Sequence, residues 1–498
     1  MEALRLEDNG AAFGKGGRTI ILFLLFCIGL YNLIHMGLPG LAVVCLLPVI
    51  GVFLYLCLQR KMFLFYVLLV ANYFVSFASR SGFLPIPISA VNEMLEVLLL
   101  ILAMIDTKDT YPSWLINTMS LGVLVWVIFT CLEIFNTQCG IPGLAGFWYT
   151  GVRLMTFQIV YATIVVTLYI TSPKMVKRFV FIWAIFSIIS AFWVWKQQTF
   201  GFTEGEKRFL VKAAKTHILN GLIRYFSVFT DAANYGCHMA AATAAFGIIS
   251  IYIKTRKLKI FYIVTCLLCC WAMFATGTRT AIFCLIAGIG IYIFLSKSAK
   301  MAVPVGLLLL FIYIFLAFTK IANGNATIRR MRSAFNKEDA SLGVREINKN
   351  TLRKYMKDLP WGVGIGVEYT DLSTNNQNRY ILMIPPDSEY VYIWVRTGKI
   401  GLIVFIISTL IMFCGAAYNV LFRIRDPEMR GISAAFTCAF VAIHLGGYAN
   451  QILLQYPNVI IFYGGLALAN VMPMLEREAR KRGELPTEEE KYNLIREE

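Results

Sequence analysis

Long apolar runs recur along the whole of this chain, and they limit its possible folds more than any other feature. Each run is about 20 residues long, the length that an α-helix needs to cross the hydrocarbon core of a bilayer. The composition agrees, because 58% of the 498 residues are apolar and only 15% are charged. A soluble protein has about 25% charged residues. These values exclude a secreted, cytosolic or disulfide-stapled protein and predict a polytopic membrane protein.

The runs predict an all-α polytopic integral membrane protein with about 14 transmembrane helices. The alternating segments of about ten residues that mark a membrane barrel do not occur. The predicted spans are 19–35, 40–58, 62–79, 90–105, 115–135, 154–172, 178–196, 231–253, 259–276, 280–296, 301–319, 400–421, 431–449 and 457–474.

Lysine and arginine are concentrated in every second short connection, which predicts that both termini are cytoplasmic. Two long segments, 196–230 and 320–399, then lie on the external side. The second holds thirteen basic residues against eight acids. Loops of this length escape the orientation rule, so their charge suits an anionic partner at the outer leaflet, such as a phosphate or diphosphate headgroup. An ordinary solvated loop is the alternative.

These segments divide the chain into four parts. Residues 1–319 form an N-terminal transmembrane bundle of about 11 spans. Residues 320–399 form a large external loop with short amphipathic helices, and residues 400–474 form the last three spans. Residues 475–498 are a charged cytosolic tail.

Residues 343–358 predict an amphipathic helix in the large loop. Arg345, Lys349, Arg353 and Lys357 recur every four residues and share one face. The other face is a rough apolar stripe of Val344, Ile347, Leu352, Tyr355, Met356 and Leu359. Such a helix would lie on the membrane interface or cover the bundle; a solvated face is the alternative for the basic residues.

Glycines at alternate positions follow in residues 360–366 and predict a close approach of the backbone to a ligand. Their spacing excludes a dinucleotide-binding fingerprint. The four histidines are scattered without the spacing of metal ligands. We therefore expect no metal, no cofactor and no nucleic-acid partner.

Several charged residues stand at the external ends of spans. Asp387 and Glu389 form a candidate acid/base site; they could instead hold a divalent cation, and Asp387 could instead cap the following helix. Arg279 lies between two spans with almost no loop, so it must face the bundle interior or a wet cavity. Arg224 precedes another span.

Four segments, in this order, resemble the O-antigen ligase and polymerase superfamily, bacterial membrane enzymes that act on undecaprenyl-diphosphate-linked glycans. The segments are RYFSVFTDAANYG from Arg224, TGTRTAIFCLIAG from Thr276, VREINKNTLRKYMKDLPWGVGIG from Val344 and PPDSEYVYIWVRTGKIGLIVF from Pro385. They lie within positions 224–405. Their order, with one large external loop before the last three spans, is more specific than any single segment.

The resemblance implies a C-type membrane glycosyltransferase-like bundle in the bacterial inner membrane, with its active site on the external side. It implies inverting, metal-independent transfer of a glycan from undecaprenyl diphosphate. Arg279, Arg224 and Arg345 would bind the diphosphate, and the base would be Asp387 or, as second choice, Glu389. The residues implied to contact substrate are Asn234, Tyr390, Trp361, Arg153 and Arg396.

One departure from the family pattern separates two activities. Ligases of this family carry His followed by Asn where this chain has Asp387 and Ser388. The difference favours a polymerase of O-antigen, capsule or exopolysaccharide repeats. A ligase onto a lipid core or a protein is the alternative.

A transporter or flippase of lipid-linked oligosaccharides is an alternative of another class, although such proteins usually show two similar halves. Expected partners are the lipid-linked donor and acceptor and the bilayer. A chain-length regulator and a flippase are further candidates.

Overall fold

The computed structural model describes most of the chain after residue 60. The described residues are 23–24, 26–31, 33–34, 37, 51–52, 55–56, 61–81, 88–105, 110–138, 145–219, 221–296, 299–321, 323–324, 326–333 and 340–486. Residues 68–498 form one compact unit, and every contact discussed below lies within it.

The described chain is built of helices. Its only strands are two residues each, β1 (Ile218–Leu219) and β2 (Leu222–Ile223), which pair antiparallel with Ile218 opposite Ile223. Ten helices in the described residues are long and apolar enough to cross a membrane. They are Met62–Ser81, Thr118–Phe135, Trp148–Tyr169, Pro173–Thr199, Ala232–Tyr252, Arg256–Ala275, Arg279–Ser296, Glu389–Arg423, Pro427–Gly447 and Val459–Lys481.

These helices confirm an all-α polytopic membrane protein, while the count of about 14 spans stays a prediction. The predicted spans 90–105 and 301–319 coincide with helices α3 (Ile88–Ile105) and α13 (Ala299–Phe318). The predicted spans 19–35 and 40–58 lie largely outside the described residues.

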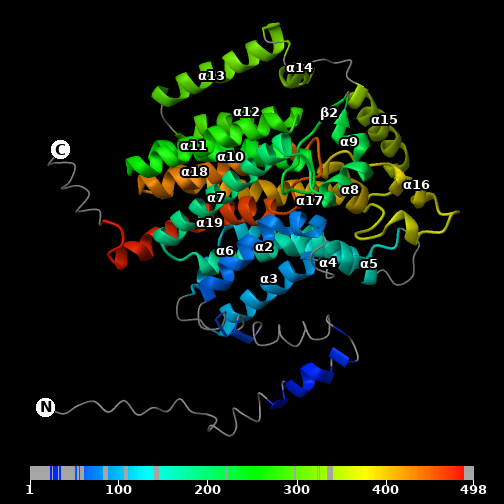
Figure 1. The fold of residues 1–498 in the computed structure, drawn as a ribbon, viewed down its shortest axis with the longest axis horizontal. Helices are drawn as coiled ribbons and strands as arrows, with labels where there is room; N and C mark the ends of the chain where they lie inside the picture. Colours follow the sequence, from blue (N-terminus) through cyan, green and yellow to red (C-terminus); the bar gives the residue numbers. More distant parts are fainter. Residues whose placement is uncertain are drawn as a thin grey trace. The chain divides into compact units, whose positions relative to one another are not determined.

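The spanning elements carry the labels of Figure 1. They are α2 (Lys61–Ser81), α4 (Thr118–Leu132), α5 (Ala145–Val152), α6 (Gln158–Tyr169), α7 (Pro173–Thr199), α10 (Ala232–Tyr252), α11 (Arg256–Ala275), α12 (Arg279–Ser296), α17 (Glu389–Tyr418), α18 (Pro427–Gly447) and α19 (Gly464–Lys481). Turns of π-helix join α5 to α6 (Arg153–Phe157), follow α17 (Asn419–Arg423) and precede α19 (Val459–Tyr463).

Helices α10, α18 and α19 are the most buried of the spanning helices. In Figure 1, α18 and α19 run between the green helices α10 to α12 and the blue and cyan helices α3, α4 and α6. Small residues allow this close packing. A Cβ on Gly288 of α12 would lie 3.1 Å from Ala244 of α10 and 3.3 Å from Ala442 of α18. By contrast, α11 exposes Leu267 and Val264 on a face suited to lipid.

The remaining elements lie between the spans. They are α8 (Glu204–Lys212), α9 (Ala214–His217), α14 (Ala326–Arg332), α15 (Ala340–Tyr355) and α16 (Gln377–Met383), with short 3-10 turns at Pro112–Leu115, Glu133–Phe135, Met356–Asp358 and Tyr369–Asp371.

The large loop packs on the start of α17 through a small apolar core. Its buried members are Leu352, Met356, Val363, Val367, Leu372, Ile381, Trp394 and Val395. Helix α15 confirms the predicted amphipathic helix, and its apolar face is confirmed at Leu352 and Met356. Val344 and Ile347 of the same stripe are exposed, because only the C-terminal half of α15 reaches the apolar core. Their contact with the membrane interface stays a prediction.

Candidate active site

A cavity of about 530 Å³ lies at one end of the helices, with walls from α12, α15, the start of α17 and the end of α18. This volume lies in the range of ligand pockets, roughly 300–1,000 Å³. Its lining residues include Arg279, Phe283, Arg345, Glu346, Asn348, Lys349, Leu352, Arg353, Asp387, Ser388, Val391, Leu445 and Tyr448.

Cations outnumber carboxylates in this lining. Arg345, Lys349 and Arg353 of α15 and Arg279 of α12 face two acids, Asp387 and Glu346. The i, i+4 spacing on α15 places its three cations on one side of the helix, as the sequence predicts. The cavity is therefore suited to an anionic ligand.

Asp387 lines the cavity just before α17 begins. Its Oδ2 accepts a hydrogen bond from Asn348 Nδ2 at 3.0 Å. The cap of α17 is the neighbouring Ser388, whose Oγ accepts from the backbone N–H of Val391 at 3.0 Å. The alternative that Asp387 caps this helix is wrong, since Ser388 already supplies the cap.

Glu389 faces a different environment from Asp387. It is buried outside the cavity lining, and its Oε2 accepts from the backbone N–H of Leu453 at 3.0 Å. In the described residues, no group of three or more His, Cys, Asp or Glu side chains could hold a metal ion. Tyr390, the next residue, places its hydroxyl 3.0 Å from His444 Nδ1.

Arg224 lies near Arg279 but is not among the residues that line the cavity. It donates to Thr278 Oγ1 at 2.9 Å and to the carbonyl of Thr216 at 3.0 Å. Burial and the positive charge of Arg330 lower the pKa of Arg224 to about 10, and Arg279 contributes in the same direction. The three guanidinium groups therefore gather around the turn that joins α11 to α12.

Arg330 belongs to this cluster although sequence reasoning did not select it. Its Nε donates to the carbonyl of Gly277 at 2.6 Å, while Arg279 donates to Ser333 Oγ at 3.2 Å. Helix α14 thus docks on the turn at Gly277. The signal available in the sequence was the basic run of residues 326–332, ATIRRMR.

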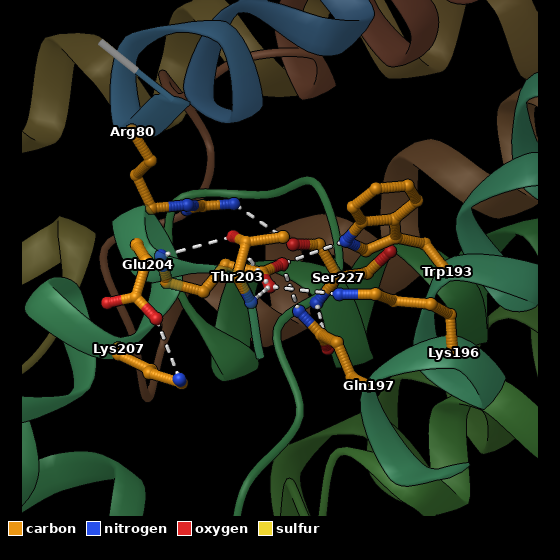
Figure 2. Close-up of polar contacts among 9 residues, drawn as sticks. Arg80, Trp193, Lys196, Gln197, Thr203, Glu204, Lys207 and Ser227 are labelled. Atoms are coloured by element: carbon orange, nitrogen blue, oxygen red, sulfur yellow. Dashed lines mark hydrogen bonds and ion pairs between the residues drawn. The ribbon is translucent and has the colours of Figure 1, made fainter. Parts of the chain in front are cut away.

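Glu206 anchors the segment that presents Arg224. This carboxylate is 1% exposed. It accepts from Trp193 Nε1 at 2.8 Å and Gln197 Nε2 at 2.7 Å, and from the backbone N and Oγ1 of Thr203 at 2.8 and 3.0 Å. In Figure 2 the donors from α7 converge on the N-terminus of α8. Burial alone would raise the pKa of Glu206, but these hydrogen bonds outweigh it and hold the pKa below its usual value.

Arg80 holds the other end of the same segment. Its guanidinium, drawn in Figure 2, donates to the backbone carbonyls of Ser227, at 3.0 Å, and Phe229. It also lies 4.8 Å from the ring centroid of Phe226. Ser227 has a φ of 52°, a conformation that costs a non-glycine residue energy. The segment between α8 and α10 is thus fixed at both ends, and Arg224 with it.

Asn234 is fully buried in a polar network rather than in the cavity lining. Its Nδ2 donates to Gln455 Oε1 at 3.0 Å, and its Oδ1 accepts from Asn458 Nδ2 at 2.7 Å. The network continues to His238, whose Nδ1 lies 2.8 Å from Asn458 Oδ1. Trp183 donates to the other ring nitrogen of His238 at 3.1 Å.

Three further residues implied to contact substrate also lie outside the cavity lining. Trp361 stacks on Phe129, with ring centroids 5.9 Å apart. Arg153 lies 3.5 Å from a carboxylate oxygen of Glu93. Arg396 is buried and pairs with Glu368 at 2.7 Å.

The alternate glycines of the large loop approach the backbone of α17. Gly398 interrupts α17 with a φ of +67°, and a Cβ there would lie 1.8 Å from the carbonyl oxygen of Pro360. A Cβ on Gly362 would lie 2.4 Å from the backbone nitrogen of Gly398. The close approach at Gly362 is to the backbone of the protein's own helix, and the expected approach to a ligand stays a prediction.

Comparison with known proteins identifies one family. Residues 264–406 match the family model described as O-antigen ligase. The matched range holds the cavity residues of α12, α15 and α17, whereas Arg224, Asn234 and Arg153 lie before it. A comparison with curated proteins gives no match. The family match supports the assignment of this multi-pass membrane protein to the O-antigen ligase and polymerase superfamily, whose members are glycosyltransferase-like enzymes that act on lipid-linked glycans.

Proposed function

We propose that the protein is a polysaccharide polymerase of the bacterial inner membrane. It transfers a growing glycan from undecaprenyl diphosphate to a sugar hydroxyl of a new lipid-linked repeat unit. One observation carries the proposal: a carboxylate, Asp387, stands in a cavity rich in cations within the family-matched part of the chain. With both termini cytoplasmic, this cavity lies on the external side with the predicted loop of residues 320–399, the end of which, from Glu389, belongs to α17.

In the proposed reaction, the acceptor hydroxyl oxygen bonds to the anomeric carbon of the donor sugar on the face opposite the diphosphate. The bond between that carbon and the diphosphate oxygen breaks, and its electron pair stays on the diphosphate. Asp387 accepts the hydroxyl proton and later releases it to water. General base catalysis of this kind contributes about 10²–10⁴-fold.

The cations of the cavity stabilise the charge that develops on the leaving diphosphate. Arg279 and Arg345 reach the cavity from two different helices and would hold the diphosphate from two directions. A guanidinium donates two parallel hydrogen bonds to phosphate oxygens, so arginine suits this task better than lysine. We propose that Arg224 and Arg330, which do not line the cavity themselves, hold the turn from which Arg279 projects. Since arginine supplies the charge, transfer should persist in a chelator such as EDTA.

The other residues implied by the resemblance are assigned supporting roles. Glu389, second choice as base, holds the loop before α19 through its hydrogen bond to Leu453. Asn234 and Tyr390 make contacts inside the bundle, with Gln455 and His444. We propose that they shape the site without touching the glycan. The same proposal covers Trp361, Arg153 and Arg396.

The test is the surface glycan of cells that lack this chain, complemented with wild type, Asp387→Asn or Asp358→Asn. Asp358 is the matched control, because it is an exposed acid beyond α15 that does not line the cavity. If the protein is a polymerase, deletion should remove the glycan ladder and leave single repeat units at the cell surface. Asp358→Asn should restore the ladder, and Asp387→Asn should not.

Other outcomes would reject this proposal in different ways. Lipid-linked polymer that accumulates without transfer to its final carrier would indicate the ligase alternative. An unchanged surface glycan after deletion would refute both enzymes, whereas loss of the single repeats together with the ladder would favour the transporter. A fully active Asp387→Asn protein would leave the family assignment intact and remove Asp387 as the base.

A further inference from the structure

Helix α15 carries a neutral side chain among its cavity cations. Asn348 lies one turn after Arg345 and lines the cavity with it. Its Nδ2 donates to Asp387 Oδ2 at 3.0 Å across the space between α15 and the start of α17. One helix therefore contacts the proposed base and also supplies a cation proposed for the diphosphate.

This hydrogen bond has a specific chemical effect on a carboxylate. A donor on one oxygen fixes the plane of the group and leaves the other oxygen, Oδ1, to accept a proton. An amide does this without adding a positive charge, so it orients the base with less loss of basicity than an arginine pair would cause. Correct orientation of a base within hydrogen-bond reach is itself a large part of its efficiency.

We infer that Asn348 is a positioning residue that orients Asp387 for proton transfer. The inference rests on the proposed function. Helix α15 holds Asp387 through Asn348, and Arg345 of the same helix reaches the cavity.

Charged groups reach the neighbourhood of Asp387 from several elements. Arg279 comes from α12, and α15 supplies Arg345, Glu346, Lys349 and Arg353, while Tyr448 lines the cavity after α18. A substitution of Asn348 removes none of these groups, so it tests the amide hydrogen bond to Asp387.

The experiment uses the full-length protein in lipid, with lipid-linked repeats extracted from cells that lack the chain as substrate. Inorganic diphosphate serves as the competitive probe of the donor site. The variants are Asn348→Ala and Asn348→Leu, which is close in size but has no donor. Thr351→Ala is the control, because Thr351 lies on α15 and bonds only to the carbonyl of Ile347 among the contacts resolved.

For either Asn348 variant, we expect kcat to fall about tenfold or more while donor KM and inhibition by diphosphate stay within about twofold of wild type. Thr351→Ala should behave as wild type. Arg345→Ala should instead weaken inhibition by diphosphate.

An Asn348→Leu protein that folds with wild-type kcat would overturn the inference. So would a fall in rate explained entirely by a higher donor KM. These results leave the proposed function standing if Asp387→Asn is inactive. A fully active Asp387→Asn protein would remove the base itself, and the two failures are therefore distinguishable.

Discussion

Replacement of Glu206 by glutamine should destabilise the protein, and the matched change at Glu204 should not. The two acids lie two residues apart in α8. The side chain of Glu204 is 82% exposed and pairs with Lys207, whereas Glu206 is 1% exposed and accepts four hydrogen bonds. Both variants lose one negative charge from the same helix, so the difference between them reports the effect of burial and hydrogen bonding at Glu206.

The magnitude follows from how the four bonds are shared. Trp193 and Gln197 donate to Oε1 of Glu206, and Thr203 donates twice to Oε2. A glutamine side chain keeps one of the two oxygens. At the position of the second oxygen it places an NH₂ group, which cannot accept the hydrogen bonds made there. It therefore loses two hydrogen bonds to a charged acceptor, each worth roughly 1.5 kcal/mol or more, so the expected loss is about 3 kcal/mol.

The assay is thermal unfolding of the purified protein in detergent at neutral and acidic pH. The pKa of Glu206 is held below its usual value, so its contribution is present above about pH 4.5 and is lost as pH falls through the folded pKa. The gap between wild type and Glu206→Gln should narrow in acid. If the Glu206 and Glu204 variants unfold at the same temperature at pH 7, the argument from buried hydrogen bonds is refuted.

Three other perturbations should be measurable by the same unfolding assay. Gly398→Ala should lower the free energy of unfolding by about 3 kcal/mol, because Gly398 has a positive φ and the added Cβ would clash with Pro360. At Gly290 nothing lies within 4 Å of an added Cβ, so Gly290→Ala should raise the free energy of unfolding by up to about 1 kcal/mol. Equal melting temperatures for these two would contradict the clash. Asn458→Ala should lower the free energy of unfolding by about 2–4 kcal/mol, because the buried imidazole of His238 and the buried amide of Asn234 lose their hydrogen-bond partner. A change below about 1 kcal/mol would show that this network is dispensable for stability. Burial lowers the pKa of His217 below 6.5, so stability should fall as pH drops from about 6.5 through that lower value; His217→Gln should flatten this part of the profile, and an identical slope would exclude His217 as its cause.

The sequence predicts best what is local. The apolar runs predict the spans, and the i, i+4 repeat of Arg345, Lys349 and Arg353 predicts the shared face that lines the cavity. Arg279 is expected at the bundle interior or a cavity because two spans leave it no loop, and it does line the cavity. Each of these inferences needs only neighbouring residues.

The sequence predicts poorly what depends on distant segments. Glu389 is buried because Leu453, 64 residues later, donates to it. Arg330 is aimed at Gly277, 53 residues earlier in the chain. The local pattern does not show the contrast between Glu204 and Glu206, because two of the four hydrogen bonds to Glu206 come from α7. The spacing of neighbouring residues in the sequence gives no indication of such partners.

Membrane insertion proceeds from the N-terminus, so Asn234 enters the bilayer long before Asn458, 224 residues later, has been synthesised. During that interval α10 carries an unfinished polar cluster, and the cavity lacks the wall that Leu445 and Tyr448 supply. A chain stopped after residue 406 would contain the whole family-matched segment and still lack both. Such a fragment would be a target for membrane quality control, and not a partial enzyme.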